Sequence, residues 1–330
     1  MRLRPPRRWK RLTAALLLVT LLIAAFINGW YWLPTGRLTV NQVNAAAAAL
    51  PVMAPLTGRV LFVSPHPDDE TLAAGGILQD VLARGGEVYV VFLTSGDGFD
   101  MDARATSRNL QLSHADLLRL GLRRMAEARA ATKALGIPGA HVSFLGFPDQ
   151  GLTAVYQQNY LVPYTSRHTG VNRVPYAGTF APGRPYTGQE LERQLAAVYD
   201  QVRPDVVLAP SVQDGHPDHR TAAYLASRLA SVRGEKLYYY LVHGGLEWPL
   251  PKGLHAGLPL VPPRPFSQGL QWYRYPLTGA QRGGKTRAIR AYQTQLMVLP
   301  RFMWAFVRQN ELLLPAPAQG DPIPPADLGK

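Results

Sequence analysis

Hydrophobic and polar positions along the middle of the chain predict strands that alternate with helices. Short apolar or β-branched runs, typical of buried strands, cover residues 60–63, 87–94, 141–145, 205–209 and 237–242. Amphipathic segments of helical period follow over residues 71–84, 117–135, 188–202 and 219–232. Strands separated by helices of this length indicate a parallel sheet with helices on both faces. The sequence therefore predicts an α/β fold with a Rossmann-like, mostly parallel sheet.

The start of the chain does not follow this pattern. Residues 12–33 carry no charge, and a helix of 22 residues would rise about 33 Å, enough to cross the hydrocarbon core of a bilayer. Residues 1–11 before it hold six basic side chains and no acidic one, and residues 30–32 are aromatic. We predict a single-pass transmembrane anchor with a cytoplasmic N-terminus and an extracytoplasmic domain. A cleaved signal peptide is the alternative, but the residues after the apolar core match a cleavage site poorly.

Composition sets limits on the rest of the chain. Hydrophobic residues make up 47%, which is typical of a globular protein, and the absence of cysteine excludes disulfides and thiolate ligands. The net charge is +13, but the basic arm beside the apolar segment accounts for six positive charges, so we expect membrane contact and no nucleic-acid partner. We predict a linker over residues 34–57, one folded domain over 58–312 and a disordered, Pro-rich tail over 313–330.

Polar residues gather directly after two of the predicted strands. The motif "SPHPDDE" (64–70) supplies His66, Asp68 and Asp69, and "HPDHR" (216–220) supplies His216, Asp218 and His219. Because ligands bind beyond the carboxyl ends of parallel strands, we expect the two motifs to meet. Imidazole and carboxylate together suit Zn²⁺ or a similar divalent ion. The alternative is that the three aspartates cap helices. The glycine-rich motifs of dinucleotide and Walker phosphate sites are missing from the sequence.

The two motifs together resemble the signature of the PIG-L/LmbE-like N-acetylglucosaminyl deacetylase family, over about residues 58–300. Weaker matches are "TSGDG" (94–98), "RMAEARAATKALG" (124–136), "LGFPDQGL" (145–152) and "KTRAIRAYQTQ" (285–295). Members of the family are zinc-dependent enzymes with a Rossmann-like fold that remove acetyl groups from amino sugars. The resemblance therefore implies a metal-dependent deacetylase with an N-acetylglucosamine-containing glycolipid or saccharide as substrate.

The resemblance also assigns roles to individual residues. It implies that His66, Asp69 and His219 bind the metal, that Asp68 is the general base and that His216 stabilises the oxyanion. It further implies substrate contacts at Arg124 and Asp149. Asp214 departs from the pattern, because some relatives have a mobile tyrosine there.

Several questions stay open from the sequence. An amidase that acts on another acyl-amino-sugar conjugate and a membrane-tethered saccharide-binding protein without catalysis are the alternative functions. The insert over residues 151–186 fits a surface loop as well as a lid over the pocket. His243, at the end of the strand predicted over 237–242, is a further candidate for the pocket. The sequence does not define the amino sugar or the oligomeric state.

Overall fold

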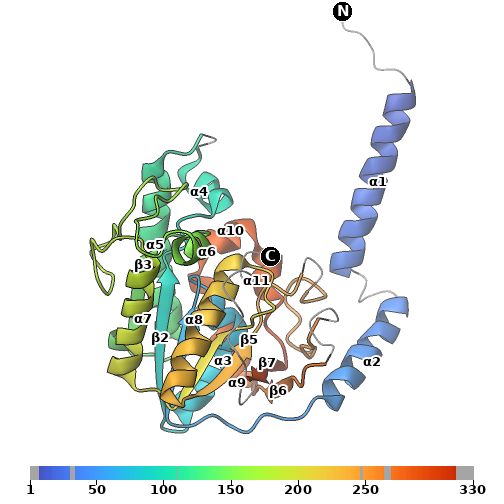
Figure 1. Ribbon diagram of the computed structural model, residues 1–330. Coiled ribbons are helices and arrows are strands. Elements are labelled where there is room, and N and C mark those ends of the chain that lie inside the picture. The colour runs from blue at the N-terminus through green and yellow to red at the C-terminus, as the bar shows by residue number, and fades with distance from the viewer. Residues whose placement is uncertain (1–6, 30–33, 110, 246–247, 264–268, 317–330) are drawn as a thin grey trace, which may run out of the picture.

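A seven-stranded sheet forms the centre of the protein in the computed structural model, which describes residues 7–29, 34–109, 111–245, 248–263 and 269–316 (Figure 1). The strands are β1 (Arg59–Ser64), β2 (Glu87–Thr94), β3 (Val142–Phe147), β4 (Val206–Pro210), β5 (Lys236–Tyr240), β6 (Tyr273–Pro276) and β7 (Asn310–Pro315). Their order in the sheet is β3-β2-β1-β4-β5-β7-β6. Strands β1 to β5 pair in parallel, whereas β7 pairs antiparallel with β5 and β6. The predicted mostly parallel sheet is confirmed, and the antiparallel edge is an addition to it.

Helices cover both faces of the sheet. Those that pack together on one face are α3 (Asp69–Ala83), α5 (His114–Ala134) and α9 (Gly279–Ala291). Those on the other face are α6 (Leu152–Gln157), α7 (Gly188–Val202) and α8 (Pro217–Arg233). The short helices α4 (Asp100–Ser107) and α10 (Gln293–Val298) lie beyond the carboxyl end of β2 in Figure 1, and α11 (Pro300–Trp304) packs against α10.

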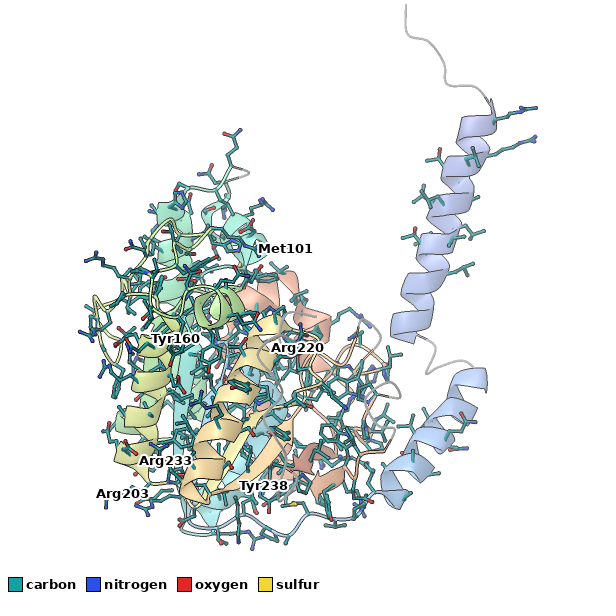
Figure 2. The ribbon with its side chains drawn as sticks, viewed as in Figure 1. Met101, Tyr160, Arg203, Arg220, Arg233 and Tyr238 are labelled. Carbon is teal, nitrogen blue, oxygen red and sulfur yellow. The ribbon has the colours of Figure 1, made fainter. Side chains whose placement is uncertain are left out.

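The direction of α7 and α8 brings their N-termini to the carboxyl edge of the sheet. Figure 2 shows Arg203 and Arg233, at the ends of these two helices, at the opposite edge from Met101 of α4. Thr187 begins α7 as an N-cap, because its side chain accepts a hydrogen bond from the Glu190 N–H. The helix predicted over residues 188–202 is therefore confirmed.

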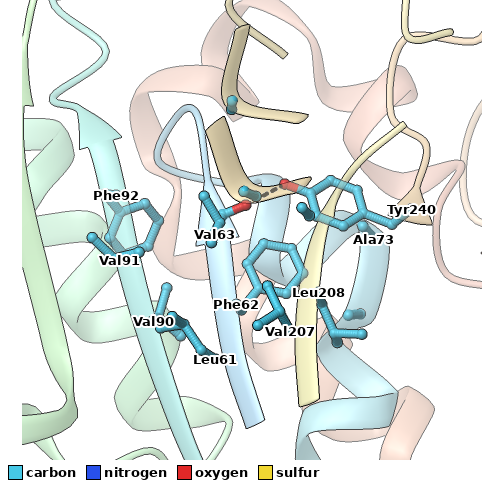
Figure 3. Close-up of a cluster of buried hydrophobic side chains, with 14 of the residues drawn as sticks. Leu61, Phe62, Val63, Ala73, Val90, Val91, Phe92, Val207, Leu208 and Tyr240 are labelled. Carbon is cyan, nitrogen blue, oxygen red and sulfur yellow. Dashed lines mark hydrogen bonds between the residues drawn. The ribbon is translucent and has the colours of Figure 1, made fainter. Parts of the chain in front are cut away.

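The core explains why the parallel strands are nearly continuous hydrophobic runs. Both faces of β1 are covered by helices, so Leu61, Phe62 and Val63 are all fully buried. Phe62 stacks on Tyr240 of β5 with ring centroids 4.6 Å apart (Figure 3). The Tyr240 hydroxyl donates a hydrogen bond of 2.9 Å to the Val63 carbonyl, which satisfies this polar group inside the core.

Strands β1 and β4 create the crevice in which a ligand can bind. They are parallel neighbours, with Val60 opposite Val206. Helix α3 follows β1 onto one face of the sheet, whereas α8 follows β4 onto the other. Because the two helices leave for opposite faces of the sheet, a crevice opens between the carboxyl ends of the two strands. Both polar motifs of the sequence follow these strands.

The segments before and after the domain differ in part from their predictions. The structure has α1 (Arg7–Gly29) and α2 (Pro34–Ala49), so much of the predicted linker is helical. Across the described residues, no helix is both long enough and apolar enough to span a membrane, and the predicted transmembrane anchor is thus unsupported. Residues 30–33 of that anchor lie outside the described residues. The extracytoplasmic location stays a prediction from the sequence.

The domain extends beyond the predicted boundary at residue 312. Strand β7 continues to Pro315, because Leu313 and Leu314 are buried and pair with β6 and β5. The remainder of the predicted tail, residues 317–330, lies outside the described residues.

Candidate active site

The turn between β1 and α3 holds the first polar motif in a fixed shape. The Ser64 hydroxyl donates to the His66 carbonyl at 2.7 Å, and the His66 N–H donates to Asp69 Oδ2 at 2.9 Å. Asp69 is the first residue of α3. The second motif begins α8 in the same way, with Pro217 in the first turn, a position that suits proline. Both motifs therefore deliver their side chains from the beginning of a helix.

Three donor atoms from these two motifs converge in the crevice. His66 Nδ1 lies 3.2 Å from His219 Nε2 and 3.5 Å from Asp69 Oδ2, and the last two atoms lie 3.3 Å apart. All three residues are buried. Three ligands that surround a zinc ion at its usual bond lengths in a tetrahedron are about 3.3 Å from one another. The spacing and the chemistry of the donor set thus fit a zinc ion.

Carboxylates lie behind both histidines of this set. His66 Nε2 is 3.1 Å from Asp149 Oδ1 and 3.3 Å from Asp218 Oδ2. His219 Nδ1 is 3.2 Å from Asp214 Oδ2. Each histidine therefore turns one ring nitrogen to the donor set and the other to a carboxylate, as metal-binding histidines commonly do. Burial opposes the charged form of His219, but the charges of Asp214 and Asp69 raise its pKa to about 9. The two carboxylates therefore favour a positive charge at this position.

Asp68 occupies a strained position at the start of α3. Its φ of 132° is outside the region that residues with a side chain normally adopt, and such strain concentrates at functional sites. The main-chain carbonyl of the preceding Pro67 accepts hydrogen bonds from Arg124 Nη2 at 2.9 Å and Gln295 Nε2 at 2.8 Å. These two side chains, from α5 and α10, hold the peptide in place.

The Asp68 carboxylate is available to the crevice. Although Asp68 is the N-cap residue of α3, its side chain makes no capping hydrogen bond. Asp68 Oδ2 lies 3.4 Å from Gln295 Nε2 and 3.7 Å from Arg124 Nη2. Burial raises the pKa of Asp68 well above its usual value, the Asp69 charge adds to the rise, and Arg124 opposes it. The capping interpretation is therefore wrong for the Asp68 side chain, and a raised pKa suits a proton acceptor.

Glu70 stabilises the same turn from behind. Its carboxylate accepts hydrogen bonds of 2.5 Å from the hydroxyls of Thr71 and Tyr292, and one of 3.3 Å from the Asp68 N–H. Glu70 is fully buried, and burial raises its pKa to about 7. The third acid of the motif therefore supports the turn and does not face the crevice.

His216 is the N-cap of α8 and has a defined hydrogen-bonding pattern. Its Nδ1 accepts a hydrogen bond of 3.2 Å from the Asp218 N–H. Burial and the neighbouring histidines lower the pKa of His216 far below its usual value, so the ring is neutral. We assign the remaining proton to Nε2, because Nδ1 is an acceptor. His216 is therefore a neutral N–H donor in the crevice.

A cavity of about 300 Å³ opens over these groups. The polar residues that line it are His66, Asp68, Arg124, Asp149, Gln150, His216, His243 and Gln295. The apolar residues that line it are Leu72, Phe99, Val242, Leu299, Phe302 and Met303. The cavity thus has a polar end and an apolar wall, and half of the residues in that wall come from the chain after residue 298.

The two predicted substrate contacts lie in the cavity wall but have partners of their own. Arg124 Nη1 donates to the Gly96 carbonyl at 2.9 Å, in addition to the bond from Nη2 to Pro67. Gly96 has a φ of 69°, and a Cβ atom there would clash with the Arg124 guanidinium. Asp149 Oδ2 accepts from the Gly98 N–H at 3.0 Å while Oδ1 faces His66. Their contact with substrate stays a prediction.

The sequence alone assigns no role to three residues near the donor set. It marks Asp214 only as a departure from the family pattern and Gln295 only as part of the weak match over residues 285–295. His243, named as a candidate, lines the cavity with its ring centroid 4.6 Å from that of His219. It is also one of four residues whose ligand atoms lie within 4.8 Å of one another, with His66, Asp69 and His219.

The chain matches a protein family and several known proteins. Residues 61–230 match the family described as "PIG-L: GlcNAc-PI de-N-acetylase". The 1D-myo-inositol 2-acetamido-2-deoxy-alpha-D-glucopyranoside deacetylase of Mycobacterium sp. (strain KMS) is 33% identical over 186 residues, 54% of this chain and 52% of that protein. The protein of the same name from Mycolicibacterium vanbaalenii is 30% identical over 78% of this chain and 88% of its own length. The chain therefore spans about half the length of the first relative.

Solved structures share the fold. The match to the A40926 pseudoaglycone deacetylase covers 78% of this chain and 96% of that protein's chain, with a TM-score of 0.52 and 21% sequence identity. The match to the zinc-inhibited form of the teicoplanin deacetylase covers 78% of this chain and 97% of that protein's chain, with a TM-score of 0.52 and 16% sequence identity.

Proposed function

The chain belongs to the PIG-L (GlcNAc-PI de-N-acetylase) family, and we propose that it is a zinc-dependent hydrolase that removes the N-acetyl group from an N-acetylglucosamine-containing saccharide or glycolipid. The observation that carries this proposal is the set of three donor atoms 3.2 to 3.5 Å apart, with the carboxylate of Asp68 in the wall of the same cavity. The relatives named above are deacetylases of an N-acetylglucosamine-inositol conjugate, which supports the substrate class.

The metal ligands of the proposal are His66, Asp69 and His219. A zinc ion held there would lower the pKa of a water molecule toward 7 and polarise the acetyl carbonyl. Asp149 and Asp218 would orient His66 by accepting the proton on its Nε2.

Asp68 is the proposed general base. It would take a proton from the attacking water and return it to the nitrogen of the amine that leaves, so one carboxylate serves both steps. Its half-buried position and raised pKa support this role, since a base must be reachable and must hold a proton between the steps. Gln295 and Arg124 would keep the carboxylate directed at the cavity.

His216 is the proposed oxyanion donor. Attack on the acetyl carbon places a negative charge on the carbonyl oxygen, and the neutral Nε2–H of His216 would donate a hydrogen bond to it. A hydrogen bond from the Asp218 N–H fixes the ring, so no reorganisation is needed when the charge develops.

The remainder of the cavity suits a sugar with an apolar neighbour. Phe99 and Phe302 supply aromatic side chains to the cavity lining, and Leu299 is 37% exposed at the apolar side. We propose Arg124 and Asp149 as contacts for the sugar hydroxyls at the polar side. The apolar wall favours a glycolipid or an aromatic aglycone over a free, fully hydrated saccharide.

Acetate release from a panel of N-acetylglucosamine glycosides, assayed with and without a chelator, tests the proposal. We expect release that stops with the chelator and returns with zinc. Release of a different acyl group from the same amine would indicate the alternative amidase. Saccharide binding without any release would contradict the proposed catalysis.

A further inference from the structure

We propose that Asp214 is a positioning residue that fixes Nε2 of His219 as the atom that binds the metal. The inference rests on the metal site proposed above and extends it to a residue outside the donor set. Asp214 lies in the turn between β4 and α8 and is 1% exposed. A buried carboxylate needs partners for its charge, and those of Asp214 connect three parts of the site.

The two carboxylate oxygens of Asp214 have different partners. Oδ2 accepts hydrogen bonds of 3.0 Å from the main-chain N–H groups of Val242 and His243, and it lies 3.2 Å from His219 Nδ1. Oδ1 accepts a hydrogen bond of 2.9 Å from the His216 N–H. One carboxylate therefore contacts the proposed ligand, the main chain of the proposed oxyanion donor and the segment that follows β5.

This arrangement decides which nitrogen of His219 carries the proton. Asp214 Oδ2 lies 3.2 Å from Nδ1 and has no proton to donate, so it stabilises the neutral form of His219 that has its proton on Nδ1. The lone pair is then on Nε2, which lies 3.3 Å from Asp69 Oδ2 and 3.2 Å from His66 Nδ1. With the other tautomer, a proton would stand where the metal must bind.

Asp214 also fixes the turn against the end of β5. The Gly215 N–H donates to the His243 carbonyl at 2.9 Å, and a Cβ atom at position 215 would lie only 2.9 Å from the same oxygen. Arg220, at the start of α8 (Figure 2), donates to the Asp214 carbonyl at 3.0 Å. Because Val242 and His243 line the cavity, the same contacts set the position of the cavity wall relative to His219.

The substitution Asp214→Asn keeps the shape and removes one of the two acceptor oxygens. If the amide oxygen stays near Val242 and His243, the NH₂ group faces the His216 N–H. If the amide is reversed, the NH₂ group faces His219 Nδ1 and favours the tautomer with a proton on Nε2. In either orientation the amide NH₂ group faces a main-chain N–H donor, and neither of these two donors has an acceptor. The substitution also removes the negative charge of Asp214, which would stabilise a bound metal ion.

Zinc affinity, measured by competition with a chromogenic chelator, is the first readout. Loss of a carboxylate behind a metal-binding histidine typically costs 10–100-fold in affinity, and we expect a fall of about that size for Asp214→Asn. Asp116→Asn is the matched control, since Asp116 is also buried and accepts a main-chain N–H, that of Ser113, in the capping box of α5. The control should bind zinc with wild-type affinity.

A second readout uses the wild-type protein, so it does not depend on whether the Asp214→Asn variant folds. In zinc-loaded wild-type protein with ¹⁵N-labelled histidine, His219 should show a proton on Nδ1 that exchanges slowly with water. The chain has eight histidines, so the signal can be assigned by its loss in His219→Gln. Absence of a protected Nδ1 proton would overturn the proposal, as would folded Asp214→Asn with an affinity within twofold of wild type.

The outcomes separate this inference from the proposed function. If His219→Ala retains zinc, the metal site itself is wrong. If His219→Ala loses zinc while Asp214→Asn binds it normally, only the positioning role of Asp214 fails.

Discussion

Asp68 and Asp69 are adjacent in the sequence but point to different neighbours. Asp69 Oδ2 belongs to the three donor atoms, whereas the Asp68 side chain contacts Gln295 and Arg124 in the cavity wall. The unusual φ of Asp68 allows this divergence within one turn. We expect Asp68→Asn to lower kcat by about 10²–10⁴-fold, the usual contribution of a general base, with zinc still bound. Acetate release and zinc content of the purified variant measure both effects.

Asp69→Asn is the matched comparison for that experiment. It makes the same chemical change one residue later, so it should lower the zinc content and regain part of its activity in excess zinc. The opposite pattern, with zinc lost from Asp68→Asn and kept by Asp69→Asn, would show that the two roles are exchanged.

His216 combines a structural and a chemical task that one substitution can separate. Asparagine is a good N-cap residue, so His216→Asn should still cap α8 while it lacks the Nε2–H donor. Loss of one oxyanion donor typically costs about 10²–10³-fold in kcat. We expect a fall of that size with little change in the thermal unfolding midpoint. A normal kcat in this variant would exclude His216 as the oxyanion donor.

The donor set was predictable because its residues stand at fixed positions after two recognisable strands. His66, Asp69 and His219 needed only the rule that parallel strands deliver their following turns to one edge. Asp214 and Gln295 could not be found in this way. Their roles depend on contacts with β5 and with the Asp68 turn, which the chain reaches only after elements far apart in sequence have packed.

At the scale of elements, a buried ion pair connects α3, α9 and β7. Lys285 Nζ donates to Glu311 Oε1 at 2.6 Å and to the Leu72 carbonyl at 2.7 Å, and both charged side chains are fully buried. Glu311 also accepts hydrogen bonds from the N–H groups of Gly76 and Ile77 within α3. The pair therefore supports the helix that begins with Asp69.

Lys285→Met should destabilise the protein strongly. Removal of one partner leaves the Glu311 charge buried and unpaired by a cation, which typically costs about 3–5 kcal/mol. Urea unfolding followed by circular dichroism measures the change. Arg84→Met is the control, because the Arg84 side chain is 49% exposed and Asp80 keeps hydrogen bonds from Tyr275 and Gln281 when the arginine is lost, so the change should cost little. Equal stability of the two variants would contradict the role of the buried pair.

The elements that the sequence predicted are those with a long apolar run or a clear helical period. Strands β1 to β5 satisfy this condition, and their predicted bounds lie within two residues of the observed ones. Strand β6 has four residues, one of which is Arg274, and β7 ends at a proline beside a Pro-rich segment. These two strands are defined by their pairing with each other and with β5, which no local pattern records.

At the scale of the whole molecule, the proposed site joins the two halves of the sheet. His66 and Asp69 come from the β1–α3 turn, whereas His219 comes from α8 on the opposite face. A third region, the chain after residue 298, supplies Leu299, Phe302 and Met303 to the cavity wall. Because its parts lie far apart in the sequence, the complete donor set exists only in the folded chain.

Zinc should therefore stabilise the folded state over the unfolded one. A ligand that binds only the native protein adds about 4 kcal/mol of stability at a free concentration 1,000 times its Kd. We expect the thermal unfolding midpoint to fall by several degrees when a chelator removes zinc, and to recover when zinc is restored. His219→Ala, which removes one of the three donors, should unfold at the same temperature with and without the chelator. An unchanged midpoint in wild-type protein whose zinc loss has been verified would mean that the ion does not bind within this donor set.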